Sequence, residues 1–513
     1  MIKNNKTLIK PGITIAVIVC VGKILGFAKQ SVIAWAFGAD GTTDVYFAAD
    51  SYIGMLGQII ITSLAPLVLT HYLSCKQRKG ELLSNRLLRD CLLFFPAIGI
   101  FIAFISCVFS QQISEVLGIS YSVSQKAELS RFIIYLSPVI ILTSIIGVIQ
   151  GTLEANYKFT PAKLSSLFFS ISIIIAVFLF KDSIGIKSLL IGFIAGYVFL
   201  TFFLMLSVKE FIHFDKEMLF RGADFKELIV CLIPVLIGNS IVDIGHLLDK
   251  IVASSLETGS VSSLYYGQVI SSDLVNAVII TTIGTILLPS LTQKVASNVS
   301  KETIKAELSK ILRITSFFVI GITSLYCIEG SNLIKLVFER GNFTAMTTDR
   351  VSNIAICYAL GFIYIAFREV LVKAHYAYKD TTSPMINSIL GVFINLISSI
   401  LFAHFLGDKG VALATSLSIL VVSVLSVITI SKHLEGYPIK KDDVFDILKS
   451  LICGFIAVVV GHFVSLCLFV EFFWLSMVTV SLIMIITYFT MNILLNGKTV
   501  KEIIRFFQCR TLK

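Results

Sequence analysis

Residues 11–50 read PGITIAVIVCVGKILGFAKQSVIAWAFGADGTTDVYFAAD, and this stretch sets the character of the whole chain. Its apolar run is long enough to cross a bilayer as a helix, which takes about 20 residues, yet it contains Lys23 and Lys29. A cation at the bilayer centre costs roughly 2.5–3.5 kcal/mol on insertion scales, so such residues usually face a bundle interior or a water-filled cavity. The stretch therefore predicts a membrane helix that lines a polar cavity for an anion.

The composition extends this conclusion to the rest of the chain. Of the 513 residues, 56% are hydrophobic and 14% are charged, whereas a soluble domain is about a quarter charged. Apolar runs long enough to span a bilayer recur along the sequence, and the alternating pattern of a membrane barrel is missing from it. We predict an all-α polytopic membrane protein with about 14 transmembrane helices.

The formal net charge of +10 follows mainly from membrane topology. With a cytoplasmic N-terminus, most of the 42 lysine and arginine residues fall in the inner segments and few in the outer loops, as the positive-inside rule requires. Both termini are therefore predicted to be cytoplasmic. The excess positive charge predicts contact with anionic membrane lipids and gives no indication of nucleic-acid binding.

The two lysines of the first helix lie at different depths. Lys23 falls near the middle of the bilayer, counted from Pro11, and Lys29 falls nearer its outer face. They are about 120° apart around the helix, so they share one cavity only if the cavity is broad or the helix bends; Gly22 and Gly26 permit such a bend. The alternative is that both lysines snorkel to the interface, which is easy near a helix end and hard at Lys23.

Further candidate site residues lie at the start of the second helix and in residues 241–250, IVDIGHLLDK. Asp44 either caps its helix or faces the cavity. Asp243 and Lys250 recur on one helix face, and Asp249 next to Lys250 can form a compensated charge pair. The predicted substrate-binding residues are Lys23, Lys29, Asp44, Asp249 and Lys250.

An internal repeat at an offset of six helices divides the chain. YKFTP at residues 157–161 matches YKDTTSP at residues 378–384, and the run from Gly185 matches the run from Gly410. An even offset preserves orientation, so the repeats are parallel about an axis normal to the membrane. We predict two parallel six-helix lobes with a cleft between them, two further helices and an interfacial amphipathic tail with an apolar stripe. The predicted boundaries are 1–220 and 221–434 for the lobes, 435–496 for the two helices and 497–513 for the tail. The stripe consists of Val500, Ile503, Ile504 and Phe507.

Motifs for hydrolysis of ATP or peptides do not occur in the sequence. Neither GxxxxGK[ST] nor HExxH is present, and the 10 cysteines are scattered without a CxxC pair. We therefore expect no enzymatic activity. Any transport has to be driven by an ion gradient, the membrane potential or the substrate gradient.

The run GKILGFAK at residues 22–29, followed by Phe-Gly-Ala at residues 37–39 and by Asp44, resembles the opening of the lipid II flippase (MurJ/MviN) family. That family belongs to the multidrug/oligosaccharidyl-lipid/polysaccharide (MOP) exporter superfamily. The similarity continues to about residue 431. It includes TILLPSL at residues 285–291, FERGNFTA at residues 338–345 and YAYKDTTSP at residues 376–384.

This resemblance implies a V-shaped cavity with alternating access, in which cations of the first lobe bind a pyrophosphate and the two last helices form a groove for a lipid tail. It also implies a sodium site, whose oxygen ligands suit a hard cation, although Asn, Ser and Thr also serve helix packing. Ser399 stands where the family has a carboxylate. The implied sodium-site residues are Asp243, Asn395, Ser399, Val411 and Thr415.

Two departures from the family pattern concern the cavity cations. The family usually places an arginine in the middle of the second helix and a Glu-Gly further on, where this chain has Gly57 and Thr62-Ser63. It also often has a basic residue after the paired tyrosines, where this chain has Gly267-Gln268. Lys23 and Lys29 are then the remaining family cations, and lysine binds phosphate as a point charge.

The resemblance implies a flippase in the bacterial inner membrane that moves the undecaprenyl-diphosphate-linked precursor lipid II to the outer leaflet. The main alternative is a flippase for a capsule or exopolysaccharide unit on a polyprenyl diphosphate. A cation-coupled drug exporter and a membrane scaffold are further alternatives, which the buried lysines disfavour. We expect a monomer in contact with membrane lipids, with Na⁺ as a candidate coupling ion and no other cofactor.

Overall fold

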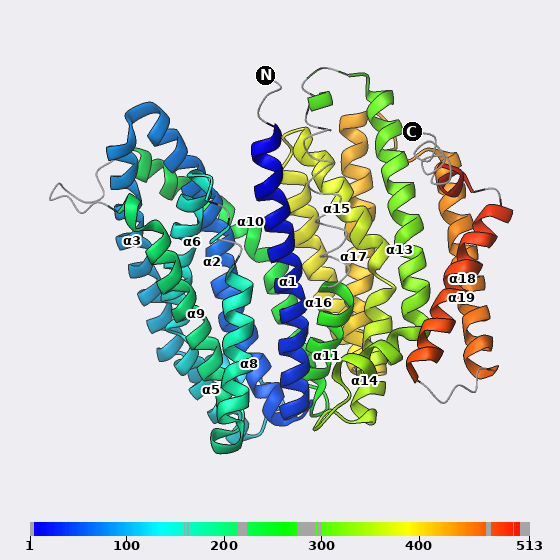
Figure 1. Ribbon diagram of the computed structural model, residues 1–513, viewed down its shortest axis with the longest axis horizontal. Helices are drawn as coiled ribbons and strands as arrows, with labels where there is room; N and C mark the ends of the chain where they lie inside the picture. Colours follow the sequence, from blue (N-terminus) through cyan, green and yellow to red (C-terminus); the bar gives the residue numbers. More distant parts are fainter. Residues whose placement is uncertain are drawn as a thin grey trace. The chain divides into compact units, whose positions relative to one another are not determined.

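The computed structural model describes residues 5–158, 160–161, 164–212, 223–273, 291, 293–295, 297, 299–467, 473–495 and 497–502. Within these ranges the backbone is almost wholly helical and contains no strand (Figure 1). The predicted all-helical class is therefore confirmed. The motif at residues 285–291 lies outside the described ranges except for Leu291, and Ile503, Ile504 and Phe507 of the predicted tail also lie outside them.

The chain divides into two compact units, and each is considered by itself. The first unit comprises Met1–Ser262 and Val337–Thr344. Its helices are α1 (Asn5–Phe37), α2 (Gly41–Lys79), α3 (Glu81–Val108), α4 (Ser110–Leu117), α5 (Val123–Leu136), α6 (Val139–Ala155), α8 (Ser165–Ile184), α9 (Lys187–Val208), η1 (Lys209–Phe211) and α10 (Ala223–Ala253).

The second unit comprises Ser263–Leu336 and Ala345–Lys513. Helix α11 (Ser260–Gln268) begins in the first unit and continues into the second. The remaining elements are η2 (Val269–Asp273), α13 (Lys301–Phe338), α14 (Ala345–Ala359), α15 (Phe362–Ala377), α16 (Thr382–Leu406), α17 (Asp408–Leu434), α18 (Lys441–Cys467) and α19 (Phe473–Leu494).

Many of these helices are suited to a membrane. In the described ranges, 10 helices are long and apolar enough to cross one, or up to 12 if each of two bent pairs is a single span. One bent pair is α14 with α15, and the other lies within α10, which bends by 40° between Ile241 and Asp243. The chain is a multi-pass membrane protein, and the predicted number of about 14 spans stays a prediction.

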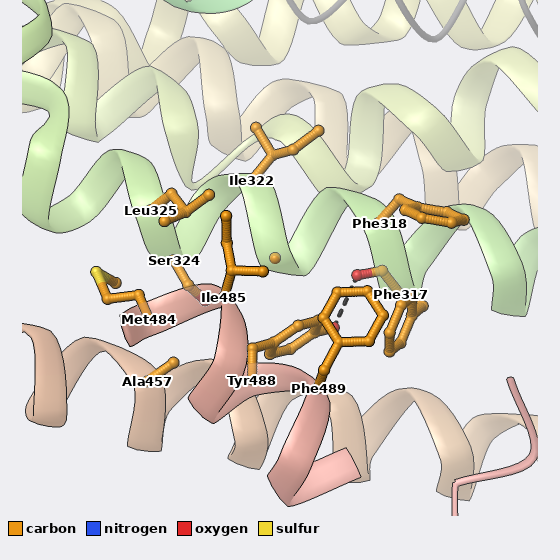
Figure 2. Close-up of a pocket in the computed structure, with 11 residues that line it drawn as sticks. Phe317, Phe318, Ile322, Ser324, Leu325, Ala457, Met484, Ile485, Tyr488 and Phe489 are labelled. Carbon is orange, nitrogen blue, oxygen red and sulfur yellow. Dashed lines mark hydrogen bonds between the residues drawn. The ribbon is translucent and has the colours of Figure 1, made fainter. Parts of the chain in front are cut away.

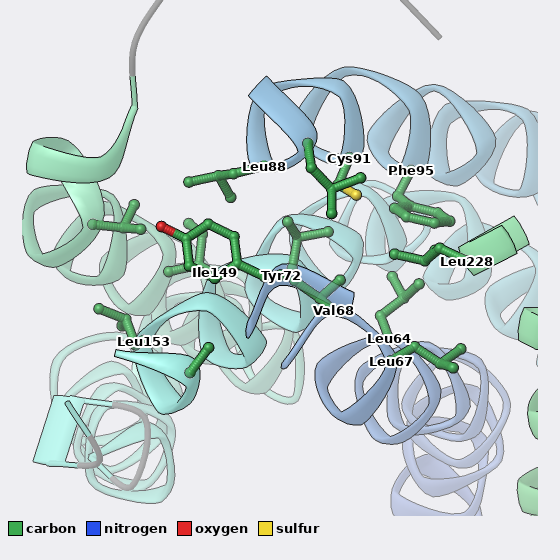
Figure 3. Packing of buried hydrophobic residues seen from close by; sticks show 14 of the residues in the cluster. Leu64, Leu67, Val68, Tyr72, Leu88, Cys91, Phe95, Ile149, Leu153 and Leu228 are labelled. Carbon is green, nitrogen blue, oxygen red and sulfur yellow. The ribbon is translucent and has the colours of Figure 1, made fainter. Parts of the chain in front are cut away.

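Helix α2 is the centre of the first unit, where it packs against α3, α5, α6 and α10. Its apolar face meets α3, α6 and α10 in a buried cluster that includes Leu64, Tyr72, Leu88 and Ile149 (Figure 3). A close approach of α6 to α2 depends on Gly151, because a Cβ atom there would lie 2.4 Å from the carbonyl oxygen of Ala65. Small residues at helix contacts allow this backbone proximity in membrane bundles.

The second unit has two packed groups of helices. Helices α14, α15 and α16 all pack against α17, and α18 packs against α19. A buried cluster joins α13 to α15 and α17 through Leu308, Leu371 and Ile430. A separate cluster joins α13 to α18 and α19 through Phe317, Ala457 and Tyr488.

Two helix hairpins in different units turn in the same way. Helix α8 ends at Gly185 with φ 59°, and α16 ends at Gly407 with φ 61°. Each glycine N–H donates to the carbonyl four residues earlier, because the left-handed conformation lets it cap the helix. By local geometry Gly185 therefore corresponds to Gly407, three residues before Gly410, with which the sequence repeat had paired it.

The helix ends at the YK motifs share a second local geometry. Tyr157 after α6 has φ 59° and Lys379 after α15 has φ 61°. In both turns the next residue, Lys158 or Asp380, donates its N–H to a carbonyl five residues earlier. By this geometry Tyr157 corresponds to Lys379, whereas the sequence repeat pairs Tyr157 with Tyr378, one residue earlier. The lobe boundaries stay a prediction.

Candidate functional site

Asp44 lies in the first turn of α2 and is 2% exposed. Its carboxylate accepts hydrogen bonds from the N–H of Gly259 at 2.6 Å, from the N–H of Ser262 at 2.7 Å and from the Ser262 hydroxyl at 2.7 Å. These two amides belong to the start of α11, where backbone N–H groups have no partner within their own helix. Asp44 therefore caps α11, which neither sequence interpretation of this residue had anticipated.

The start of α2 has its own cap. The Asp40 carboxylate accepts hydrogen bonds from the N–H groups of Thr42 at 2.9 Å and Thr43 at 3.0 Å, and the Thr43 hydroxyl accepts one from the Asp40 N–H at 2.7 Å. This reciprocal pattern is a capping box. It leaves the Asp44 carboxylate available for α11. The assignment of Asp44 to substrate binding stays a prediction.

Two of the motifs that carry the family resemblance meet at the end of α1. Asn342 donates its N–H to the Trp35 carbonyl at 3.0 Å and its side-chain amide to the Ala36 carbonyl at 2.6 Å. Gly38 turns with φ 68°, and a Cβ atom there would lie 2.5 Å from the Asn342 carbonyl oxygen. The Phe-Gly-Ala motif at residues 37–39 thus provides the turn against which the segment of residues 337–344 docks.

Lys29 is partly buried on α1, which packs against α8. Its ammonium lies 4.6 Å from the centre of the Phe169 ring. The Phe169 ring contacts Phe193 and Tyr197 of α9, with ring centres 5.0 and 5.5 Å apart. A cation held over an aromatic face is attracted to it by roughly 0.5–2 kcal/mol. Lys29 is therefore held by an aromatic cluster instead of snorkelling freely.

Asp50, on α2, lies within electrostatic range of one lysine on each of two other helices. Its carboxylate interacts electrostatically with the ammonium groups of both Lys29 on α1 and Lys250 on α10, and α2 packs directly on α10. Sequence spacing does not identify Asp50 as a partner of these lysines, because no spacing rule relates residues on different helices. The signal in the sequence was that Asp50 is a second acidic residue, after Asp44, in an otherwise apolar run.

The other predicted anion-site residues are distributed unevenly. Asp249 is 5% exposed on α10, next to Lys250. Lys23 is exposed on α1, whereas Lys29 is partly buried. Lys29 and Lys250 are therefore both within electrostatic range of Asp50. The roles of Lys23, Lys29, Asp249 and Lys250 in substrate binding stay predictions.

The predicted sodium residues belong to different units. Asp243 lies at the bend of α10 in the first unit. Asn395 and Ser399 on α16 are 5% and 0% exposed, and Thr415 on α17 is 8% exposed and donates its hydroxyl to the Val411 carbonyl at 3.1 Å. The buried oxygens that α16 and α17 contribute are amide, hydroxyl and carbonyl, which are hard ligands without a negative charge. In the described residues, no three His, Cys, Asp or Glu side chains cluster as for a metal ion. The sodium site stays a prediction.

An apolar cavity of about 190 Å³ lies among α13, α18 and α19 in the second unit (Figure 2). Its walls include Phe317 and Ile322 of α13, Ala457 of α18, and Met484 and Tyr488 of α19. The Tyr488 hydroxyl donates to the Phe317 carbonyl at 2.7 Å. An apolar cavity of roughly 150 Å³ is enough to bind benzene, so this one can hold part of a hydrocarbon chain.

A bundle of apolar helices with lysines and carboxylates inside one unit defines the class of a multi-pass membrane transporter. Solved structures share this fold. The inward closed conformation of the lipid II flippase MurJ has a TM-score of 0.78 at 22% identity, covering 93% of this chain and 98% of that one. An inward-facing multidrug resistance MATE family transporter of the MOP superfamily has a TM-score of 0.70 at 11% identity, with 80% and 94% covered.

The family model of the lipid II flippase MurJ matches residues 33–493, and the chain belongs to this family. The probable lipid II flippase MurJ of Vibrio cholerae is 22% identical over 464 residues, which cover 88% of each chain. That of Treponema pallidum is 23% identical over 447 residues, covering 82% of this chain and 81% of the relative. The family resemblance read from the sequence motifs is confirmed.

Proposed function

We propose that this protein translocates lipid II, a peptidoglycan precursor linked to undecaprenyl through a diphosphate, from the inner to the outer leaflet of the bacterial inner membrane. The observation that carries the proposal is the interaction of Lys29 and Lys250 with the single carboxylate of Asp50. Membership of the family supports the same substrate class, since its relatives bear the name lipid II flippase.

The diphosphate is the part of such a lipid that most needs a protein to cross the membrane, because charge in the hydrocarbon core is costly. Lys29 and Lys250 would bind its oxygens as point charges. Asp50 would occupy these ammonium groups in the absence of substrate, so an incoming diphosphate has to compete with it. This competition limits the affinity and lets the lipid leave on the other side.

Translocation by alternating access moves the head group without making or breaking a covalent bond, so the protein acts as a transporter and not as an enzyme. Sodium is the candidate coupling ion. Asn395, Ser399, Val411 and Thr415 would offer it neutral oxygen ligands, and Asp243 stays a ligand predicted from the sequence alone. With Ser399 in place of a carboxylate, this set would bind a single Na⁺ weakly.

We further propose that both termini are cytoplasmic and that the protein acts as a monomer. The distribution of lysine and arginine along the sequence supports this orientation. The polyprenyl chain of the substrate would lie along the apolar surfaces of α13, α18 and α19, where an apolar cavity is available.

A second candidate function is transport of a capsule or exopolysaccharide unit on the same polyprenyl diphosphate. It is favoured by Gly57 and Gly267-Gln268, which stand where the family pattern has basic residues, because fewer cations suit a different head group. A drug exporter is disfavoured, because Lys29 and Lys250 would repel cationic drugs.

Growth of a bacterium depleted of its own lipid II flippase tests the proposal. The intact gene should restore growth, Lys29→Ala should abolish this rescue at unchanged membrane abundance, and Lys29→Arg should retain much of it. Lys187→Ala, at an exposed position in the same unit, is the matched control and should rescue fully. Failure of the intact gene, together with rescue of a strain lacking a capsule flippase, would favour the second candidate.

A further inference from the structure

Arg313 of α13 is a buried charged residue, with 3% of its surface exposed. In the sequence it lies far from the residues of the predicted anion site. Three carboxylates surround its guanidinium. Its Nε lies 3.0 Å from Asp443 Oδ1, one terminal nitrogen lies 3.5 Å from Asp446 Oδ2, and the other lies 2.7 Å from Glu502 Oε1. Asp443 and Asp446 belong to α18, whereas Glu502 belongs to the C-terminal segment, defined here as residues 497–502.

The same cluster holds the backbone of the C-terminal segment. Asp446 accepts hydrogen bonds from the N–H of Lys498 at 2.8 Å, from the N–H of Thr499 at 3.2 Å and from the Thr499 hydroxyl at 2.9 Å. Arg313 also donates to the Thr499 hydroxyl at 3.0 Å. Asp446 therefore caps the start of the segment, and Arg313 ties it to α13.

A buried ion cluster of this kind is stable only as a complete set. Moving charges out of water is expensive, and the attraction between them repays this expense only when the geometry is good and the remaining hydrogen bonds are made. Without Arg313, three carboxylates would face one another and repel. The arginine therefore compensates the charges of the carboxylates that hold the C-terminal segment, and Lys310, 3.1 Å from Glu502 Oε2, adds a second cation at the partly exposed edge.

The ion cluster is continuous with the apolar cavity. Phe317 lies one helical turn from Arg313 on the same face of α13, and it lines the cavity (Figure 2). Val500 of the C-terminal segment is 2% exposed and lies in the same hydrophobic cluster as Phe317 and Tyr488. The segment thus presents polar side chains to Arg313 and an apolar side chain to the residues that line the cavity.

We propose that Arg313 is a positioning residue for the lipid chain: by docking the C-terminal segment against the hydrophobic cluster of Phe317 and Tyr488, it keeps the cavity among α13, α18 and α19 in the shape that grips a long polyprenyl chain. This inference rests on the proposed function. The cavity supplies the apolar contacts, the segment adds Val500 to the cluster that forms its wall, and the buried arginine helps to hold the segment in place. Release of the segment loosens the packing of α18 and α19 on α13 and weakens the grip.

The test uses the full-length protein in nanodiscs and two probes, undecaprenyl monophosphate and farnesyl monophosphate, which share a head group and differ in chain length. Binding of each is measured by competition with a photo-crosslinking analogue. The ratio of the two affinities reports the chain alone, whereas general structural damage lowers both affinities together. The wild type should prefer the longer chain.

Arg313→Gln should lower this preference about tenfold, equivalent to ~1.4 kcal/mol, with farnesyl monophosphate binding unchanged. Glu502→Gln should lower it by a smaller factor, because Arg313 keeps its two partners on α18 and the fold is retained. Arg313→Lys keeps the positive charge but loses the planar guanidinium with its several N–H donors, so its affinity ratio should lie between those of the wild type and Arg313→Gln. The matched control is Lys498→Gln in the same C-terminal segment. It removes an exposed ion pair between Lys498 and Asp442 of α18 and should leave the affinity ratio unchanged.

Equal ratios for the wild type, Arg313→Gln and Glu502→Gln would overturn the inference, as would a wild type with no preference between the chains. If Arg313→Gln does not fold, the test rests on the ratio of the two affinities in Glu502→Gln: a ratio equal to that of the wild type overturns the inference. These outcomes are separate from failure of the proposed function, which would appear as a wild type that binds neither lipid phosphate.

Discussion

Asp44 accepts hydrogen bonds from both the backbone N–H and the hydroxyl of Ser262, each at 2.7 Å, although 218 positions separate the two residues in sequence. The carboxylate is 2% exposed, and the N–H of Gly259 is its third donor. One buried side chain therefore joins the start of α2 to the start of α11. Charge-assisted hydrogen bonds of this kind are about twice as strong as neutral ones.

Replacing this carboxylate should destabilise the protein. Asp44→Asn keeps the size of the side chain but loses the negative charge and presents an amide N–H₂ to the donors of α11, so we expect a loss of about 1–3 kcal/mol in the free energy of unfolding. Thermal unfolding of the detergent-purified protein measures this. Glu257→Gln, at an exposed position in the same turn, should change little. Equal melting temperatures for Asp44→Asn and the wild type would show that the cap contributes no stability.

Asp50 should control how readily the substrate leaves. Asp50→Asn removes the carboxylate that competes for Lys29 and Lys250, so we expect binding of a diphosphate lipid to tighten about tenfold, or ~1.4 kcal/mol, and translocation to slow. Equilibrium binding and a flipping assay in liposomes separate the two effects. Asp182→Asn, at an exposed position of α8, is the control. Weaker binding in Asp50→Asn would mean that Asp50 orients the lysines instead of competing with the lipid.

Replacement by alanine should have opposite effects at two glycines, one at the contact between α2 and α6 and one on α1. At Gly151 an added Cβ would lie 2.4 Å from the Ala65 carbonyl oxygen, whereas at Gly26 of α1 nothing lies within 4 Å. Gly151→Ala should therefore destabilise the protein by about 1–3 kcal/mol through overpacking. Gly26→Ala should be neutral or stabilising by up to ~1 kcal/mol, because alanine favours the helix. Melting temperatures of the two purified variants test this, and a stable Gly151→Ala would contradict the close approach of the helices.

Asp380, in the turn between α15 and α16, predicts an acid-dependent stability. Burial alone would raise the pKa of this carboxyl, but hydrogen bonds from Ser383 and His433 outweigh it and hold the pKa at about 2. Because the pKa in the folded protein is below the ordinary value of 3.8, the stabilisation is fully present above about pH 4 and is lost as the pH falls toward 2.

Comparison of the wild type with Asp380→Asn isolates this effect. The difference in melting temperature between the two should be constant above about pH 4 and should shrink as the pH falls toward 2. Circular dichroism of the detergent-purified proteins provides the measurement. A difference that grows on acidification would reverse the sign of the proposed linkage.

The features that could be predicted from the sequence are those that depend on composition and local pattern. Apolar length identified the helices, and the motifs at residues 22–29 and 338–345 indicated the family. Contacts between distant segments were not predictable in this way. Asp44 was interpreted either as a cap of its own helix or as a cavity residue, because spacing reports only neighbours along the chain, and Asp40 fills the cap position.

The sequence by itself determined that this chain is a helical membrane protein of the lipid II flippase MurJ family, because bilayer thickness converts apolar length directly into spans. Only the tertiary structure decided which charges act together. It placed Asp50 within electrostatic range of Lys29 and Lys250. It also joined Asp44 to the start of α11, and Arg313 to three carboxylates from two segments. Electrostatic and hydrogen-bond energies depend on distance in space, and that distance is set by how the helices pack and not by how far apart the residues lie in the sequence.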